Sequence, residues 1–184
     1  MVSSMRFSNE ATNATRLILC LRLGLLLMAL AFFSSGCSRA VGACRVLAAV
    51  NNPRVGTLDV ALSLQFSATQ LAALDHGIPL ALEFIVTPEQ APEQLARVQL
   101  RYLPMAKRYQ LSAQGTAARE FSSRVQLLAA LDQVRLPLAL QSGAKGMISM
   151  HLDSSALPAP MRLPALFDPE WRLQCAPFHW TSSP

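Results

Sequence analysis

Few side chains in this sequence combine the residue type and the spacing that catalysis or metal binding requires. The three histidines, His76, His151 and His179, are far apart, and no HxxxH, HxH or CxxC pair occurs. A metal site needs several converging ligands, which this spacing does not provide. The sequence also contains neither a Gly-x-Ser-x-Gly nucleophile elbow nor a glycine-rich phosphate loop. We therefore expect no catalytic residue, no metal and no cofactor.

The C-terminal segment gathers side chains that favour molecular recognition. Trp171, Phe178 and Trp180, with Arg162 before them, form a possible binding surface for a peptide, a glycan or a lipid. Aromatic residues and Arg are enriched at interfaces, which supports this interpretation. The alternative is that the rings belong to the core, where large apolar side chains of a strand usually lie.

The N-terminal segment has the layout of a secretory signal. Three arginines precede residues 23–33, an uninterrupted apolar run of eleven residues, and the small residues 34–36 follow. A transmembrane helix needs about 20 apolar residues, which is more than this run supplies. A retained membrane span is therefore the alternative to a cleaved signal. We predict a signal peptide or N-terminal anchor over residues 1–36, and export of the remaining chain.

The cysteine after this segment is a candidate for lipidation. Residues 33–37 resemble a bacterial lipobox, in which the thiol of the cysteine, here Cys37, is acylated. Each buried CH₂ group contributes about 0.8 kcal/mol, so several acyl chains would hold the protein firmly at a membrane. Alternatively, residues 41–43 form a plain signal-peptidase site that releases a soluble chain beginning at Cys44. Residues 37–44 are predicted to be a short tether.

Composition and charge argue against a nucleic-acid partner. Without residues 1–36, 148 residues remain, which is enough for one domain, with thirteen basic and ten acidic side chains and a net charge of +3. Nucleic-acid binding requires a clustered basic face. The basic side chains from Arg97 to Arg108 are close in sequence to the acidic Glu89 and Glu93, which dilute the positive charge. We therefore expect an ordinary solvated surface there and no nucleic-acid site.

Two cysteines remain near the ends of the mature domain, Cys44 and Cys175. By alternation Cys44 shares a face with Val46 and Ala48, and Cys175 shares one with Leu173, so both are expected to face the core. In an oxidising compartment a disulfide between them would persist, and its large loop would contribute up to about 4–5 kcal/mol. The alternative is two buried apolar thiols.

The apolar pattern predicts a mainly β (α+β) fold. Residues 58–66 alternate with a period of two, and Ser67 with Gln70 forms a capping box that opens a short helix. Hairpin-length links favour antiparallel, sandwich-like sheets with two short helices in a single domain over residues 45–180. The predicted elements are strands over 44–50, 58–66, 78–86, 97–103, 108–113, 118–121, 147–152 and 171–180, helices over 67–76 and 123–136, and irregular chain over 154–170.

The C-terminal part of the sequence resembles the sequence pattern of a known family. A Leu-Pro-x-Pro run, a Pro-x-Trp-x-Leu step and a terminal Trp fall at Leu157, Pro158, Pro160, Met161, Arg162, Pro169, Trp171, Leu173 and Trp180. Over residues 45–180 the chain resembles an uncharacterised family of exported Gram-negative bacterial proteins, domain of unknown function 4390. The resemblance implies an envelope protein and supplies no catalytic residue. Residues 87–94 lack aromatics usual in the family, and Cys175 and Pro177 stand where Ser and Trp are more common.

Three functional hypotheses follow. The first is a non-catalytic periplasmic interaction or accessory domain, tethered to the inner or outer membrane and bound to an envelope protein, or else soluble in the periplasm. The second is a small-ligand or lipid-binding envelope domain with an apolar cavity between its sheets. The third is a hydrolase that uses Asp168, Glu170 and a histidine, since paired carboxylates support acid–base chemistry.

Overall fold

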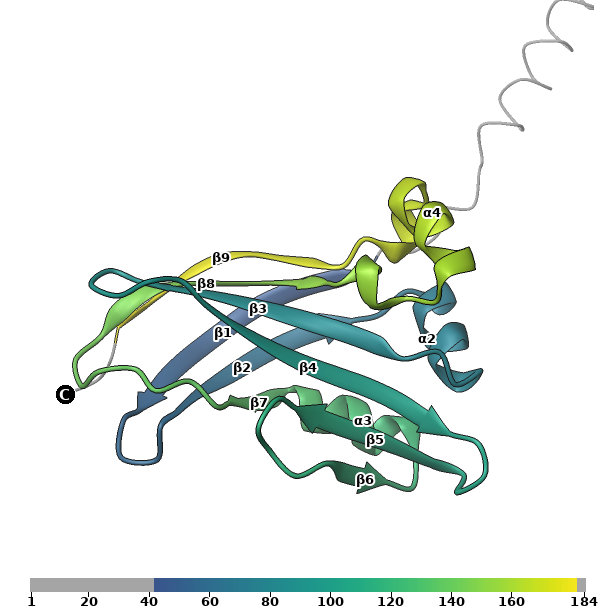
Figure 1. Ribbon diagram of the computed structural model, residues 1–184, viewed down its shortest axis with the longest axis horizontal. Helices are drawn as coiled ribbons and strands as arrows, with labels where there is room; N and C mark the ends of the chain where they lie inside the picture. Colours follow the sequence, from purple (N-terminus) through teal and green to yellow (C-terminus); the bar gives the residue numbers. More distant parts are fainter. Residues whose placement is uncertain (1–41, 182–184) are drawn as a thin grey trace, which may run out of the picture. The chain divides into compact units, whose positions relative to one another are not determined.

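The computed structural model describes residues 42–181, which form two β-sheets with helices packed against them (Figure 1). The strands are β1 (Ala43–Asn52), β2 (Thr57–Gln65), β3 (Leu80–Pro88), β4 (Gln94–Leu103), β5 (Arg108–Ala113), β6 (Arg119–Phe121), β7 (Gln133–Leu136), β8 (Lys145–Leu152) and β9 (Gln174–Thr181). The helices are α2 (Ala68–Asp75), α3 (Arg124–Leu131) and α4 (Ala159–Phe167), with the short 3₁₀ turns η1 (Ser154–Ala156) and η2 (Pro169–Trp171).

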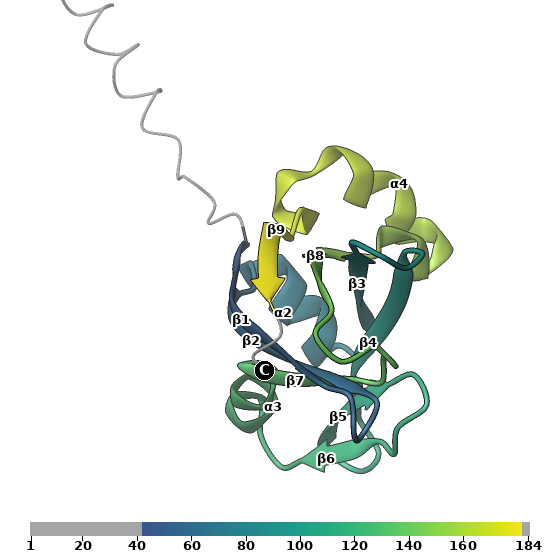
Figure 2. The ribbon, with the colours of Figure 1, turned by 90° about the vertical axis from the view of Figure 1, so that its left-hand side faces the viewer.

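One sheet is narrow and the other is wide. The narrow sheet has the order β1-β2-β7, and the wide sheet has the order β6-β5-β4-β3-β8-β9. Every neighbouring pair is antiparallel, which confirms the predicted mainly β architecture with a minor helical part. Figure 2 shows β1 and β2 on one side of the domain and β3 and β4 on the other. The core lies between them, with Leu58, Leu62, Phe84, Leu100 and Ile148 among its fully buried side chains.

The first helix begins and ends as its sequence predicts. The backbone N–H of Gln70 donates to Ser67 Oγ at 3.1 Å, and the Ser67 N–H donates to the Gln70 side-chain oxygen at 3.0 Å. These two bonds form the predicted capping box at the N-terminus of α2. Gly77 follows the helix with a φ of 83°, in the left-handed region that favours glycine.

The second helix ends earlier than its apolar spacing predicts. α3 stops at Leu131, and Val134 lies in β7, which pairs with β2. Val125, Leu128 and Leu131 follow one another at helical spacing, which predicts a shared buried face, but the Val125 side chain is 75% exposed. Val134 fits both a helical spacing from Leu131 and an alternating strand with Leu136, so periodicity alone does not separate the two.

Residues 154–170 are largely helical, where the prolines predict irregular chain. Asp153 caps η1, and Asp168 caps η2 by accepting a hydrogen bond from the Glu170 N–H. Pro160 lies in the first turn of α4, where the N–H that proline lacks would have no partner within the helix. The described chain therefore has three α-helices, one more than predicted.

A bulge in β1 changes which residues face the core. The pairing of β1 with β2 shifts register between Val46 and Ala48. Beyond the bulge Ala49 is buried and Ala48 is exposed. The prediction that Ala48 shares the core face with Val46 is therefore wrong, because an extra residue in one strand reverses the alternation that follows.

A disulfide joins one edge of the narrow sheet to one edge of the wide sheet. Cys44 of β1 is bonded to Cys175 of β9, with their Cα atoms 4.6 Å apart and a separation of 131 positions in the sequence. Both strands end their sheets. Cys175 is fully buried, whereas Cys44 is half-buried.

Several predictions concern residues before the described part of the chain. The signal or anchor over residues 1–36 and the lipidation candidate Cys37 both lie outside residues 42–181, as does most of the predicted tether over 37–44. Within residues 42–181, none of the helices has the length and apolar character that crossing a membrane requires.

We expect removal of the disulfide to destabilise the domain strongly. Replacing both Cys44 and Cys175 by Ser should lower the free energy of unfolding by about 2–5 kcal/mol, because the unfolded chain regains the entropy of a large loop. Urea denaturation followed by Trp fluorescence measures the loss. Dithiothreitol should lower the urea midpoint of the wild type and leave that of the double variant unchanged. Equal midpoints for the two oxidised proteins would contradict the prediction.

Candidate functional site

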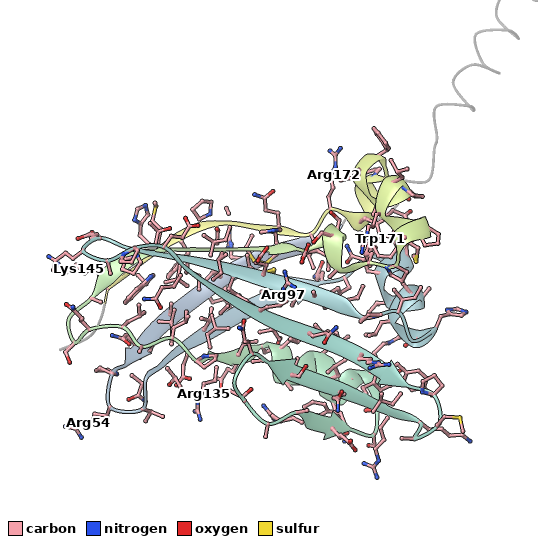
Figure 3. The ribbon with its side chains drawn as sticks, viewed as in Figure 1. Arg54, Arg97, Arg135, Lys145, Trp171 and Arg172 are labelled. Carbon is pink, nitrogen blue, oxygen red and sulfur yellow. A yellow bond between two sulfur atoms is a disulfide. The ribbon has the colours of Figure 1, made fainter. Side chains whose placement is uncertain are left out.

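The residues predicted to form an aromatic binding surface lie in different environments. Trp171 and Trp180 are only 6% and 2% exposed and belong to the core; Figure 3 shows Trp171 beside α4. Phe178 is half-buried, and Arg162 is exposed, with its Nε donating to the Leu157 carbonyl oxygen at 2.8 Å. The prediction of a binding surface is wrong for the two tryptophans, because their rings complete the core.

Asp168 and Glu170, the carboxylates of the hydrolase hypothesis, have structural roles. Asp168 Oδ1 accepts a hydrogen bond from the Glu170 N–H at 2.9 Å. The Glu170 carbonyl oxygen accepts hydrogen bonds from Ser67 Oγ at 2.8 Å and Gln70 Nε2 at 2.9 Å, and its carboxylate accepts one from the Thr69 hydroxyl. These bonds attach η2 to the N-terminus of α2, and so hold the C-terminal segment on the domain.

The histidines are placed on separate elements. His76 Nδ1 lies 2.6 Å from the Ala72 carbonyl oxygen at the end of α2. His151 Nε2 lies 3.4 Å from Glu83 Oε2, and His179 is exposed on β9. Within residues 42–181, no three His, Cys, Asp or Glu side chains gather to hold a metal ion.

A row of ionisable side chains crosses the solvent-facing side of the wide sheet. Arg97 of β4, Glu83 of β3 and His151 of β8 are neighbours in register. Arg97 Nη2 lies 3.7 Å from Glu83 Oε1 and 2.8 Å from Asp153 Oδ2. The Asp153 side chain is only 9% exposed, whereas Arg97 is half exposed. The row therefore ties the end of β8 to β4 across the intervening strand.

Asp153 has a pKa below its ordinary value of 3.8. Burial by itself raises the pKa, but hydrogen bonds from the Ser155 hydroxyl at 2.6 Å and N–H at 2.9 Å, with the charge of Arg97, outweigh it. Efficient acid–base catalysis needs a pKa near the working pH. A carboxylate held ionised in this way suits a structural role better than proton transfer.

A groove opens where the narrow sheet meets the β4–β5–β6 part of the wide sheet. Its volume is about 810 Å³, within the range of about 300–1,000 Å³ that is usual for ligand pockets. One wall comes from β1, β2 and β7, and the other comes from β4, β5 and the connection to β6. Most lining residues are apolar and many are small, among them Val50, Val60, Ala61, Leu111, Ala113 and Val134.

Edge strands from both sheets border the groove. β7 ends the narrow sheet and contributes residues 133–135, and β6 ends the wide sheet and contributes Arg119. At the rim, Arg135 Nε donates to Asp59 Oδ1 at 2.8 Å. The Arg119 guanidinium lies 5.3 Å from the centre of the Phe121 ring. The groove thus combines apolar walls, a charged rim and two backbone edges.

The helix α3 connects the two edge strands and is held in place by a shared carboxylate. Asp75 of α2 pairs with Arg124 of α3 and accepts a hydrogen bond from Tyr109 Oη of β5 at 2.8 Å. Burial and the hydrogen bond to Asp75 raise the pKa of Tyr109, so its hydroxyl stays protonated and continues to donate. These contacts fix α3 against β5 and α2, between the two strands that border the groove.

No local sequence pattern indicates the residues of this groove. Its small side chains, such as Ala48, Ala61 and Ala113, come from three strands and are unexceptional singly. The bulge also places Ala48 on a different face from the one that alternation predicts. The sequence predicts an apolar cavity between the sheets, but that prediction comes from the fold class and identifies no lining residue.

Comparison with known proteins supports the family resemblance. A family model described as "Domain of unknown function (DUF4390)" matches residues 46–181, which is most of the chain. No curated protein and no solved structure matches the chain.

We expect Asp153→Asn to lower the free energy of unfolding by about 1–3 kcal/mol at neutral pH, since Arg97 loses its nearest carboxylate. The folded-state pKa of Asp153 lies below the unfolded-state pKa. Its contribution is therefore fully present above the unfolded-state pKa and is lost as the pH falls through the folded-state pKa. The difference between wild type and variant should shrink below about pH 4.

Urea denaturation at a series of pH values measures this difference. Glu120→Gln is a matched control, because Glu120 and its partner Arg108 are about half exposed and their charged atoms lie 4.0 Å apart. An exposed pair of this kind contributes little, so the control should stay close to wild type. A loss for Asp153→Asn that does not change with pH would contradict the assignment.

Proposed function

Since the chain belongs to the family described as Domain of unknown function (DUF4390), a description that names no activity, we propose a function from its groove. The protein is a non-catalytic interaction domain of the cell envelope, tethered to a membrane, and the groove binds an extended segment of a partner protein. The predicted signal over residues 1–36 and the lipidation candidate Cys37 support this location. The Cys44–Cys175 disulfide also supports it, since disulfides persist in oxidising compartments.

The observation that carries this function is the pair of sheet edges beside one apolar groove. An edge strand has N–H and C=O groups that point away from its sheet, and an extended peptide can pair with them. Alternate side chains of such a peptide point to the same side, so every second one would enter the groove. β7 is well placed for this pairing, because its consecutive residues 133–135 line the groove.

The rim gives the groove a preference among partner segments. Arg119 and Arg135 lie beside the apolar walls, and Arg135 is already paired with Asp59. A carboxylate on the partner would meet Arg119 directly and would compete with Asp59 for Arg135. We infer that the preferred segment alternates apolar side chains with acidic ones.

Photo-crosslinking in intact membranes tests this function. A photo-reactive amino acid at Ala117, an exposed position on the groove wall, should capture the partner protein. The same amino acid at Ala176, an exposed alanine of β9, is the matched control and should capture little. Ala61→Trp fills the groove and should reduce capture at Ala117 by about tenfold, as loss of a central contact does. Equal capture at both positions, or capture unaffected by Ala61→Trp, would exclude this site.

The apolar walls and the volume of about 810 Å³ favour one second candidate, a small apolar ligand or acyl chain in the same groove. Native mass spectrometry of protein isolated from cell envelopes separates the two. A ligand would add a discrete mass to the wild type that is absent from Ala61→Trp. A wild-type protein with no added mass excludes this candidate.

A further inference from the structure

The helix α4 presents an apolar stripe to solvent. Leu163, Leu166 and Phe167 are 67%, 58% and 78% exposed, and their spacing of i, i+3 and i+4 places them on one face of the helix. In a globular domain such a stripe normally faces the core. Here the opposite side of α4 packs inward, with Ala165 buried and Met161 half-buried.

Contacts on both flanks of α4 fix the direction of this stripe. Before the helix, Leu157 is buried and its carbonyl oxygen accepts a hydrogen bond from Arg162 Nε. After the helix, η2 contains the buried Trp171, and the carbonyl oxygen of Glu170 accepts hydrogen bonds from the start of α2, including one from Ser67 Oγ. The stripe cannot turn inward without breaking these contacts, so its exposure is a property of the folded domain.

The exposed charges next to the stripe are positive. Arg162 lies on α4 and Arg172 follows η2; both are exposed, and Figure 3 shows Arg172 pointing outward beside α4. The nearby carboxylates of Asp168 and Glu170 take part in the hydrogen bonds that cap η2 and attach it to α2. An apolar stripe flanked by arginines matches a lipid surface, because acyl chains accept the apolar side chains and anionic headgroups attract the guanidinium groups.

The stripe lies at the end of the domain where the described chain begins. A Cβ placed on Gly42 would lie 3.0 Å from Cδ1 of Leu173, which is two residues after η2. The Cys44–Cys175 disulfide joins the chain two residues after Gly42 to the chain two residues after Leu173. The apolar run 23–33 ends nine residues before Gly42. A chain of this length spans at most about 30 Å. The helix α4 can therefore reach a membrane in which this apolar run is inserted. It can equally reach a membrane that holds an acyl group on Cys37.

We propose that α4 docks on an anionic lipid bilayer, with Leu163, Leu166 and Phe167 among the acyl chains and Arg162 and Arg172 at the headgroups. A tether alone leaves the orientation of the domain free, whereas docking through α4 sets it. Three side chains bind a bilayer weakly by themselves. A short tether raises the effective concentration of the bilayer at the helix, so the two act together.

Full-length protein reconstituted into vesicles of phosphatidylethanolamine and phosphatidylglycerol tests the docking. Leu166→Trp places a reporter in the stripe, and Val125→Trp places a matched reporter at another exposed apolar position, on α3. Lipids brominated in their acyl chains quench a tryptophan that enters the bilayer, and the buried Trp171 and Trp180 give the same background in each protein. Quenching of Leu166→Trp should exceed that of Val125→Trp by about twofold or more. Equal quenching in the two variants overturns the proposal.

A second variant separates docking from an effect of the reporter. Adding Leu163→Ser and Phe167→Ser to Leu166→Trp should reduce its quenching to the Val125→Trp level, while the urea midpoint stays unchanged because both side chains are exposed. If the stripe instead contacts a second copy of the chain, Leu166→Trp stays unquenched and crosslinks between copies form at α4, which overturns bilayer docking. None of these results depends on the occupant of the groove.

Discussion

The two sheets differ in width, and the rest of the structure depends on that difference. A three-stranded sheet covers only part of a six-stranded one, yet the apolar face of the wide sheet must be removed from water. On one side the sheet edges are joined, because the disulfide links β1 to β9. On the other side β6 and β7 are connected through α3. The helix α2 contacts β4 and the helix α3 contacts β5, and Leu74 and Leu127 of these helices are fully buried.

This asymmetry places a groove on the side where the edges are connected by a helix. At the disulfide the strands lie close and Cys175 is fully buried, so the core is closed there. Where β4 and β5 face β2 and β7, small residues such as Ala61 and Ala113 line the space between the walls. The contacts of Asp75 with Tyr109 and with α3 keep that helix in place. The groove follows from incomplete coverage of one sheet by another.

The sequence predicts those features of the fold that depend on near neighbours. The alternation of β2 and the capping box at Ser67 are local, and both are found in the structure. The helix α4 escapes prediction because proline is read as a breaker, whereas Pro160 lies in the first turn, where proline is tolerated, and Pro164 lies inside the helix. The position of Val134 fits both a helical and a strand periodicity, so the end of α3 is not predictable from spacing. The bulge after Val46 arises from pairing with β2, which lies outside the local sequence. The groove combines side chains from distant segments, a convergence that no local pattern encodes.

The positions of α4 and the groove bear on what the groove binds. Figures 1 and 2 both place α4 on the side of the domain opposite to β6 and β7, which border the groove. With α4 on a bilayer, the groove would open toward the aqueous phase. An acyl chain would then have to cross water to enter it, which is unfavourable for apolar surface. A segment of a hydrated protein meets the groove directly, and the arginines at the rim, Arg119 and Arg135, suit such a partner. Docking through α4 therefore favours a polypeptide over a lipid as the occupant.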